Sequence, residues 1–232
     1  MAEEGGIGAA SARRAAGSRS APGDSSGTPQ ISDDLAAIRE AFDLRAPVYD
    51  ESEMHRELAE AVASFAATSD AGTVLDVATG TALVLRALRV HLPRARLIGA
   101  DISPGMLAVA RKALPDAEWL EADAASLPFP DASVDLITCA TALHVIPDTR
   151  GTIGEWRRLL RPGGRVVTAT FMAGSRRPGP AKYRTLSTDH ESFESPAALE
   201  SRVAGAGFAV ARHAESRFGQ DVILIAELVP EG

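Results

Sequence analysis

Three aspartates stand at or just after the ends of three successive apolar runs. Asp76 lies in VLDVATGTA, Asp101 closes LIGAD, and Asp123 follows EWLEA. Carboxylates accept hydrogen bonds from ribose hydroxyls and from an adenine amino group. If the three runs are neighbouring strands of one sheet, the acids meet at one edge and form a site for a nucleoside.

The turn after the first run contains a single glycine. Ala78, Thr79 and Gly80 are small enough for a ligand to approach the backbone, and the helix expected next would offer free N–H groups. The dinucleotide signature needs glycines in a G-x-G-x-x-G frame, whereas this chain has Ala78, Gly80 and Leu83 there. Asp101 therefore favours a ribose-bearing ligand. The single glycine indicates that a pyrophosphate is not the group that approaches this turn.

The periodicity of apolar residues predicts which elements position these acids. Short apolar runs predict strands at 74–77, 96–100, 117–120, 134–140 and 165–171, and a closing hairpin of 208–213 with 222–228. Helical spacing or capping residues predict helices near 35–42, 58–65, 85–92, from Ser103-Pro104 onward, at 153–160 before Pro162-Gly163-Gly164, and at 196–204 before Gly205.

Strands that alternate with helices predict an α/β protein with a parallel sheet covered on both faces. We expect a disordered tail over 1–30, rich in Ala, Gly, Ser and Arg, and a single domain over 31–232. Within it we expect cap helices at 31–70, a cofactor-binding core at 71–172, a polar substrate cover at 173–196, and a C-terminal helix and hairpin at 197–232.

The composition excludes several classes of function. A net charge of −7 gives no electrostatic footprint for nucleic acid or an anionic membrane. No apolar run approaches the roughly 20 residues of a membrane span, and the N-terminus lacks the apolar region of a secretory signal. The single cysteine permits no internal disulfide. We expect a cytoplasmic protein, a monomer or homodimer, that acts on a small molecule.

Five motifs in this order resemble the class I S-adenosylmethionine-dependent methyltransferases over roughly residues 42–228. VLDVATGTA is similar to the first motif, LIGADISPGML to the second, ADAASLPFPDASVDLITC to the third and fourth, and LLRPGG to the segment before the fifth strand. DVATGT and FDLRAPVYDE look most like the branch with ubiquinone/menaquinone and secondary-metabolism enzymes. The resemblance implies a Rossmann-like, seven-stranded, mostly parallel sheet with a C-terminal antiparallel hairpin and N-terminal cap helices.

The resemblance also implies a set of residues that bind S-adenosyl-L-methionine (SAM), whose product is S-adenosyl-L-homocysteine (SAH). The set consists of Tyr49, Asp76, Ala78, Thr79, Gly80, Asp101, Ile102, Met106, Asp123, Ala124 and Cys139.

Each part of the cofactor has its own residues in this assignment. Asp101 would hold the ribose hydroxyls, and Ile102 with Met106 would flank the adenine. Asp123 and Ala124 would read the adenine edge. The backbone of Ala78, Thr79 and Gly80 would contact the methionine part, near Cys139, under a lid formed by Tyr49.

Structural alternatives stand beside four of these roles. Asp76 would then cap local backbone groups, Met106 would be core, and Cys139 would be a buried strand residue. Tyr49 would pin the N-terminal helices. Ala82 stands where the family usually has glycine, and its methyl group costs little only if its φ is negative.

Methyl transfer mainly requires that the acceptor is positioned and water excluded, and a hydroxyl acceptor benefits from a nearby base. His144, just past the fourth strand, is the candidate base; the alternative is a histidine that caps the next helix. Tyr183 and His190 are weaker candidates. The five histidines show no close pairing, so we predict no metal site.

These observations predict a SAM-dependent methyltransferase of small molecules. We expect O-methylation slightly ahead of C- or N-methylation. The alternative is an enzyme of natural-product biosynthesis with this fold that catalyses cyclisation or rearrangement without methyl transfer. A non-catalytic binding module is the third alternative.

Overall fold

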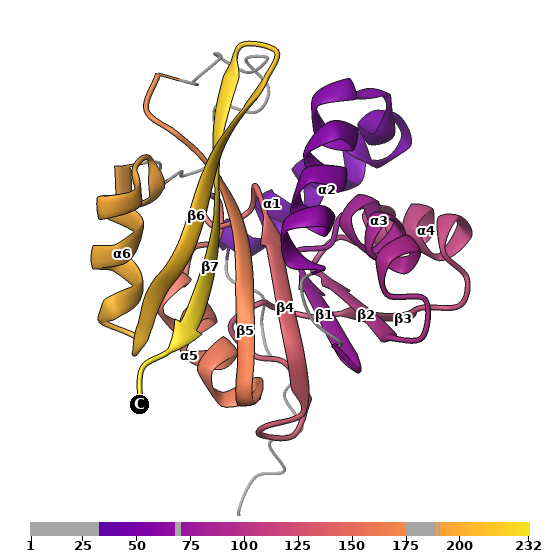
Figure 1. The fold of residues 1–232 in the computed structure, drawn as a ribbon. Helices are drawn as coiled ribbons and strands as arrows, with labels where there is room; N and C mark the ends of the chain where they lie inside the picture. The colour runs from indigo at the N-terminus through magenta and orange to yellow at the C-terminus, as the bar shows by residue number, and fades with distance from the viewer. Residues whose placement is uncertain (1–32, 68–70, 175–188, 190) are drawn as a thin grey trace, which may run out of the picture. The chain divides into compact units, whose positions relative to one another are not determined.

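A seven-stranded sheet forms the centre of the computed structural model, which describes residues 33–67, 71–174, 189 and 191–232 (Figure 1). Its order is β3-β2-β1-β4-β5-β7-β6. The strands are β1 (Thr73–Val77), β2 (Arg96–Asp101), β3 (Glu118–Glu121), β4 (Val134–Ala140), β5 (Leu160–Phe171), β6 (Phe208–Phe218) and β7 (Asp221–Pro230). β1 to β5 pair in parallel, and β7 pairs antiparallel with β5 and β6. The predicted fold class is therefore confirmed.

The order of the strands reverses between β1 and β4. From β1 the sheet extends through β2 to β3, and the chain then returns to place β4 on the other side of β1. Leu75 of β1 consequently pairs with Ile98 and with Ile137. Ligands of open α/β sheets bind beyond the carboxyl ends of the strands at such a reversal, so the loops after β1, β2 and β4 are the place for a site.

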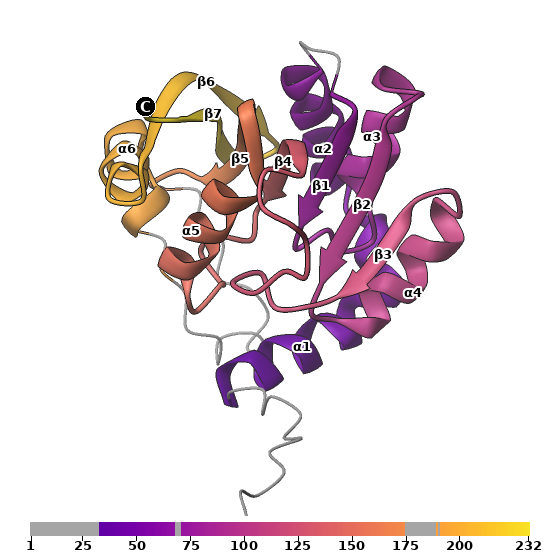
Figure 2. The same cartoon turned by 90° about the horizontal axis from the view of Figure 1, so that it is seen from below.

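Helices cover both faces of the sheet (Figures 1 and 2). Residues of α2 (Glu53–Ala66), α3 (Leu83–His91) and α4 (Pro104–Ala113) share one apolar cluster with β1 and its neighbours. Residues of α5 (Thr149–Leu159) and α6 (Pro196–Ala204) share a second cluster with the opposite face. Val74 belongs to the first cluster and Leu75 to the second, as the alternation of side chains along a strand requires.

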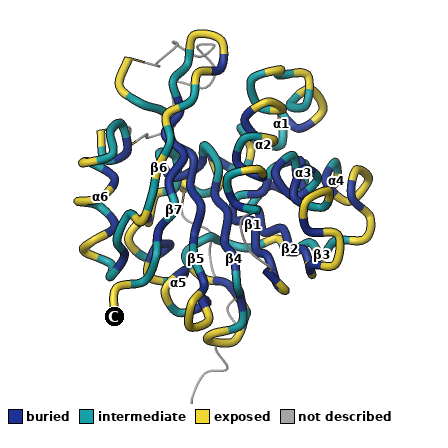
Figure 3. Tube along the Cα trace, in the orientation of Figure 1, coloured by how far each residue is buried: buried dark blue, intermediate teal, exposed yellow. Residues whose placement is uncertain are grey.

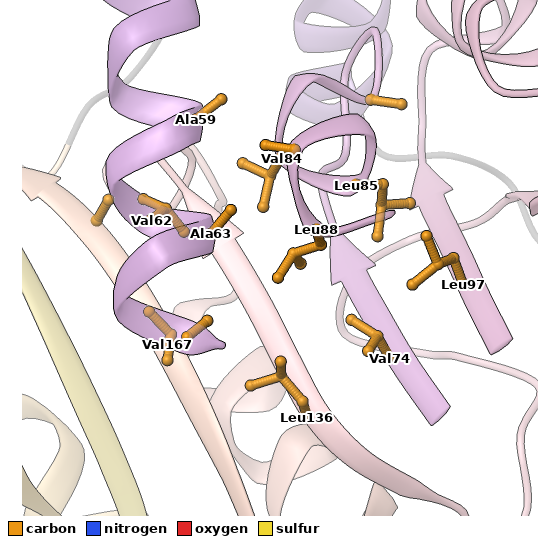
Figure 4. Packing of buried hydrophobic residues seen from close by; sticks show 14 of the residues in the cluster. Ala59, Val62, Ala63, Val74, Val84, Leu85, Leu88, Leu97, Leu136 and Val167 are labelled. Atoms are coloured by element: carbon orange, nitrogen blue, oxygen red, sulfur yellow. The ribbon is translucent and has the colours of Figure 1, made fainter. Parts of the chain in front are cut away.

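The strands are the most deeply buried part of the described chain, and the outer surfaces of the helices are exposed (Figure 3). Figure 4 shows Val62 of α2 and Leu88 of α3 packed over Val74, Leu136 and Val167. All five side chains are fully buried. Burial of an aliphatic side chain of this size stabilises a fold by roughly 1.5–3 kcal/mol, so this layer fixes α2 and α3 on the sheet.

The N-terminal segment adds α1 (Asp33–Arg45) and the 3-10 helix η1 (Ala46–Glu51), both of which pack against α4. The predicted start of α4 is confirmed, because the Ser103 hydroxyl accepts a bond from the Met106 N–H at 3.0 Å and Pro104 is the first helical residue. A short 3-10 helix, η3 (Glu191–Phe193), precedes α6.

Two predicted boundaries are wrong. Leu160 was predicted as the end of a helix, but it is the first residue of β5. The periodicity of apolar residues cannot distinguish the last residue of a helix from the first residue of a strand that follows it directly. Val134 pairs with Leu160 and Leu136 with Arg165, so residues 161–164 form an irregular insertion in the strand. The hairpin strands β6 and β7 are also longer than predicted, because their outer residues alternate in polarity without ending the pairing.

The tail predicted over 1–30, most of the predicted substrate cover, and the candidates Tyr183 and His190 lie outside the described residues. The described residues, from 33 onward, cluster as one compact unit. In the described part of the chain, no helix has both the length and the apolar character that a membrane span requires.

Candidate active site

The turn between β1 and α3 takes a left-handed backbone conformation at alternate positions. Ala78, Gly80 and Ala82 have φ angles of 54°, 56° and 68°. Glycine adopts this conformation freely, whereas an alanine costs about 1–2 kcal/mol there. The φ angle of Ala82 is therefore positive, and its methyl group does not meet the condition under which it would cost little. The turn holds backbone strain of the kind that collects at functional sites.

Asp101 ends β2 with its carboxylate against this turn. The Gly80 N–H donates to Asp101 Oδ2 at 2.8 Å, and the Ser103 N–H donates to Oδ1 at 2.8 Å. Burial raises the pKa of Asp101 to about 6, although these backbone hydrogen bonds oppose the shift. Each carboxylate oxygen has a second lone pair, so Asp101 can also accept hydrogen bonds from two ligand hydroxyls.

Asp76 lies in the middle of the sheet, where β1 and β4 are adjacent. The Thr79 hydroxyl donates to Asp76 Oδ2 and the Thr138 hydroxyl donates to Oδ1, both at 2.6 Å. Burial raises the pKa of the Asp76 carboxyl to about 6. Asp76 thus ties the turn to β4 and places a second buried carboxyl close to Asp101.

Two adjoining cavities lie at this edge of the sheet, and five residues line both of them. These residues are Tyr49, Ala78, Gly80, Ala140 and Thr141.

The first cavity, which we name the Asp101 cavity, combines two acids that follow or end neighbouring strands, Asp101 and Asp123, with an apolar wall. Asp101, Ile102, Met106, Asp123 and Ala124 form one side. The remaining wall is almost wholly apolar and consists of Leu35, Ile38, Phe42, Ala100, Ala122, Ala142, Val145, Ile146 and Pro147. Such a mixture suits a ligand with a polar nucleoside part and an apolar neighbour.

The second cavity, which we name the Asp76 cavity, is more polar. Besides the five shared residues, it is lined by His55, Leu58, Ala59, Asp76, Thr79, Thr81, Leu83 and Val84.

Tyr49 of η1 lines both cavities and is held there by several contacts. Its ring stacks on His55 with centroids 4.5 Å apart and an interplanar angle of 5°. The Arg45 guanidinium lies 5.3 Å from the Tyr49 ring centroid, and the Tyr49 hydroxyl shares a hydrogen bond with Thr141. Burial raises the pKa of Tyr49, so its hydroxyl stays protonated.

Two acids hold this N-terminal lid, which we define as residues 33–51, against the sheet. The Asp43 carboxylate accepts from the Ser103 hydroxyl at 2.6 Å and from the Gly105 N–H at 2.8 Å. This pair of bonds fixes α1 to the start of α4, beside Ile102.

The second of these acids is Asp50. Its carboxylate accepts from the Thr81 hydroxyl at 2.5 Å and from Arg86 Nη1 at 2.8 Å. Asp50 thereby joins the lid to the turn after β1, through Thr81 next to Gly80, and to α3, through Arg86.

Ten of the eleven predicted cofactor residues line one or both cavities: Tyr49, Asp76, Ala78, Thr79, Gly80, Asp101, Ile102, Met106, Asp123 and Ala124. Met106 is also almost fully buried, so lining and core packing are combined in one side chain. The eleventh, Cys139, is placed elsewhere. It is fully buried in the cluster under α5 and lines neither cavity, because its side chain points to the opposite face from Ala140. Burial raises the pKa of its thiol.

His144 does not line either cavity. Its ring packs edge-on against Phe171 at 5.5 Å, and its backbone carbonyl accepts from the Asp189 N–H at 2.8 Å. The neighbouring residues Ala142 and Val145 line the Asp101 cavity instead. The structure therefore places the predicted base at the carboxyl edge of the sheet, next to the Asp101 cavity but not in its wall.

Sequence reasoning missed several residues that line or hold the site. Leu35, Ile38 and Phe42 were predicted only as one face of a helix, and their spacing cannot show what that face covers. Asp43 and Asp50 lie in FDLRAPVYDE. Two acids on either side of a short segment with several apolar residues could have indicated that this segment is anchored to the rest of the fold. His55 had no sequence signal, since its stacking partner is known only from the fold.

The strand order defines an open α/β protein with acids at the carboxyl ends of its strands, and comparison with known proteins gives its family. The family described as "Methyltransferase domain" matches residues 75–168. Demethylmenaquinone methyltransferase of Thermus thermophilus is 33% identical over 186 residues, which are 66% of this chain and 81% of that protein.

One further relative and one solved structure of similar fold extend the comparison. Malonyl-[acyl-carrier protein] O-methyltransferase of Hahella chejuensis is 34% identical over 142 residues, which cover 60% of this chain and 51% of that protein. The solved complex of DhpI with SAH has a TM-score of 0.67 and 23% identity, over 85% of this chain and 97% of that one. The chain belongs to the class I S-adenosylmethionine-dependent methyltransferases. It is an enzyme of that family, with SAM as its cofactor.

Proposed function

We propose that the protein transfers the methyl group of SAM to an apolar small molecule held in the Asp101 cavity. The observation that carries this proposal is the pairing, in one cavity, of the Asp101 carboxylate with the apolar wall of Leu35, Phe42 and Val145. When bound, SAM supplies an electrophilic methyl group on a sulfonium centre.

The residues present fit the cofactor. Asp101 has free lone pairs for the ribose hydroxyls, and Ile102 with Met106 gives an apolar surface for adenine. Asp123 lines the same cavity and is available to the adenine amino group. The polar Asp76 cavity is then left for the methionine part. This assignment keeps the predicted roles of these residues as proposals.

We infer that the lid limits the access of water to the site. Tyr49 lines both cavities, and α1 supplies three apolar side chains to the wall of the Asp101 cavity. A site from which water is excluded strengthens the electrostatic interactions inside it and prevents hydrolysis. We infer that the lid also holds the acceptor against the methyl group, which is the main requirement of methyl transfer.

For the acceptor atom we propose oxygen, with His144 as the base that removes its proton. The ring of His144 packs against Phe171 and lines neither cavity, but His144 lies in the loop after β4, beside Val145 of the cavity wall. The proposal therefore requires the side chain of His144 to turn toward a bound acceptor. If His144 acts as the base, His144→Gln should lower kcat by about 10²-fold or more, with a smaller effect on KM. An unchanged kcat would remove His144 from the reaction.

A second candidate is C-methylation of an aromatic ring. It is favoured by the relative from Thermus thermophilus, whose name includes demethylmenaquinone, together with a relative from Hahella chejuensis, 38% identical over 106 residues, that is named as a ubiquinone/menaquinone biosynthesis C-methyltransferase. The relatives named above are methyltransferases, and none favours the cyclisation alternative.

One experiment separates these possibilities. The protein is incubated with SAM labelled with carbon-13 in its methyl group and with a panel of hydroxylated aromatic and quinol acceptors. Mass spectrometry detects the transfer, and the carbon-13 chemical shift distinguishes methyl on oxygen from methyl on carbon. Conversion of an acceptor into a cyclised or rearranged product without the label would contradict the proposed function.

A further inference from the structure

The half-buried side chain of His55 has one buried nitrogen, Nδ1, that the described residues leave without a hydrogen-bond partner. His55 lies in the first turn of α2, where its backbone N–H donates to the Ser52 hydroxyl at 3.4 Å. Its side-chain Nδ1 atom is shielded from solvent and has no hydrogen-bond partner among the described residues. An unsatisfied buried polar atom costs about 1–3 kcal/mol, so it persists where a ligand supplies the missing partner.

The position of His55 indicates which ligand that is. His55 lines the Asp76 cavity together with Asp76, Thr79 and Thr81. Its ring is held parallel to Tyr49 at 4.5 Å, so the imidazole has one fixed orientation at the roof of this cavity. A preorganised side chain binds a ligand with little loss of conformational entropy.

The charges around the cavity are divided between its two sides. The lid side carries the Arg45 guanidinium, which lies 5.3 Å from the centroid of the Tyr49 ring that stacks on His55. Burial first and Arg45 second lower the pKa of His55 to about 4, while Asp50 opposes the shift, so near neutral pH the imidazole is neutral and carries one N–H. The opposite side carries the Asp76 carboxyl, which keeps lone pairs free beside its bonds to Thr79 and Thr138.

An amino acid group fits this division of charge, with its ammonium toward Asp76 and its carboxylate toward the lid. We propose that His55 binds the carboxylate of the methionine part of SAM by donating an imidazole N–H. The inference rests on the proposed function and adds to it the residue that recognises the amino acid end of the cofactor. Tyr49 acts on this bond as a positioning residue, because it fixes the plane of the imidazole.

The test uses two ligands that differ only in the amino acid part. SAH carries it, and 5′-methylthioadenosine keeps the nucleoside and the sulfur without it. Isothermal titration calorimetry gives the affinity of each ligand for the wild-type chain, for His55→Phe, which keeps a ring on Tyr49, and for His55→Gln, which keeps a donor. His91→Gln, an exposed histidine at the end of α3, is the matched control.

We expect His55→Phe to weaken SAH binding by about ten-fold or more and to leave binding of 5′-methylthioadenosine within about two-fold. His55→Gln should fall between wild type and His55→Phe for SAH, and it keeps the test valid if the phenylalanine variant does not fold. Unchanged SAH affinity in both variants, or an equal loss for both ligands, would overturn the assignment of His55. Failure of the wild-type chain to bind SAH would instead contradict the proposed function.

Discussion

The N–H of Gly80 donates a hydrogen bond of 2.8 Å to the carboxylate of Asp101, which joins the turn after β1 to the end of β2. Gly80 lies in the turn that follows β1, and Asp101 is the last residue of the neighbouring strand β2. The bond fixes the acid that we assign to the ribose and the glycine that lines both cavities in one rigid unit. Loss of either partner should therefore affect cofactor binding more than folding.

Substitution of Gly80 separates backbone strain from ligand exclusion. A Cβ atom at Gly80 would have Met106 Sδ, at 4.0 Å, as its nearest neighbour, so Gly80→Ala costs only the left-handed conformation, about 1–2 kcal/mol of unfolding free energy. Because Gly80 lines both cavities, SAH affinity should fall by about ten-fold or more. Urea denaturation and calorimetry give the two quantities.

Gly163 provides the matched control for this experiment. It also has a positive φ, 80°, and an added Cβ atom would meet no atom within 4 Å. Gly163→Ala should lose a similar amount of stability and keep full SAH affinity. Equal affinity losses in the two variants would show that Gly80 acts through stability alone.

Cofactor affinity should increase with pH. In the free protein burial raises the pKa of both Asp76 and Asp101 to about 6, so below that pH both carboxyls are protonated. Ribose hydroxyls and an ammonium group favour the ionised carboxylates, and binding therefore lowers both pKa values and releases protons near pH 6. SAH should bind more tightly at about pH 7.5 than at about pH 5. Calorimetry in buffers of different ionisation enthalpy measures the protons released, and proton uptake near pH 6 would contradict the sign.

Asp50 should control how long the cofactor stays bound. Asp50→Ala removes the acceptor for Thr81 and Arg86, and with it the link between lid and turn. We expect a loss of about 1–2 kcal/mol in unfolding free energy and a several-fold faster dissociation of SAH, measured by stopped-flow displacement. Glu118→Ala, which breaks an ion pair with Arg96 that is 54% exposed on each side, is the control and should change neither quantity by much. A wild-type dissociation rate in Asp50→Ala would show that the lid is held by other contacts.

Glu227 should be important for stability because it joins α2 to the sheet. Its carboxylate pairs with Arg212 at 2.8 Å and with Arg165 at 3.2 Å. The same two arginines donate to the backbone carbonyls at the end of α2. Glu227→Ala leaves two partly buried cations without their shared anion, and we expect a loss of about 2–3 kcal/mol in denaturant unfolding. Glu60→Ala on the exposed face of α2 should stay within about 0.5 kcal/mol, and a similar small change in Glu227→Ala would refute this role.

The sequence predicts the sheet and the acids well because both depend on local rules. Apolar runs and capping residues place β4 and α6 at their observed bounds, and alternation along the chain brings Asp76, Asp101 and Asp123 to one edge. Small residues after β1 correctly indicate a tight turn, but the sign of φ at Ala82 depends on tertiary packing and has no local signal.

The lid was harder to predict because its contacts join residues far apart in the sequence. The bond from Arg86 to Asp50 crosses 36 positions, and the one from Ser103 to Asp43 crosses 60. Cys139 shows a related limit. Neighbouring residues of a strand face opposite sides of the sheet, so an error of one position exchanges the two faces. The family motif identifies the correct segment of β4, but Ala140 and not Cys139 lines the cavity.

The most direct test of the account is a calorimetric comparison of SAH and NADH binding to the wild-type chain and to Asp101→Ala, with Asp116→Ala as the matched surface control. Asp116 is 61% exposed in its ion pair with Arg89 and lines neither cavity. We expect one SAH to bind per chain, NADH to bind far more weakly, and only Asp101→Ala to lose SAH affinity, by about ten-fold or more. Tighter binding of NADH than of SAH, or unchanged SAH affinity in Asp101→Ala, would contradict the central claim that this edge of the sheet binds SAM through Asp101.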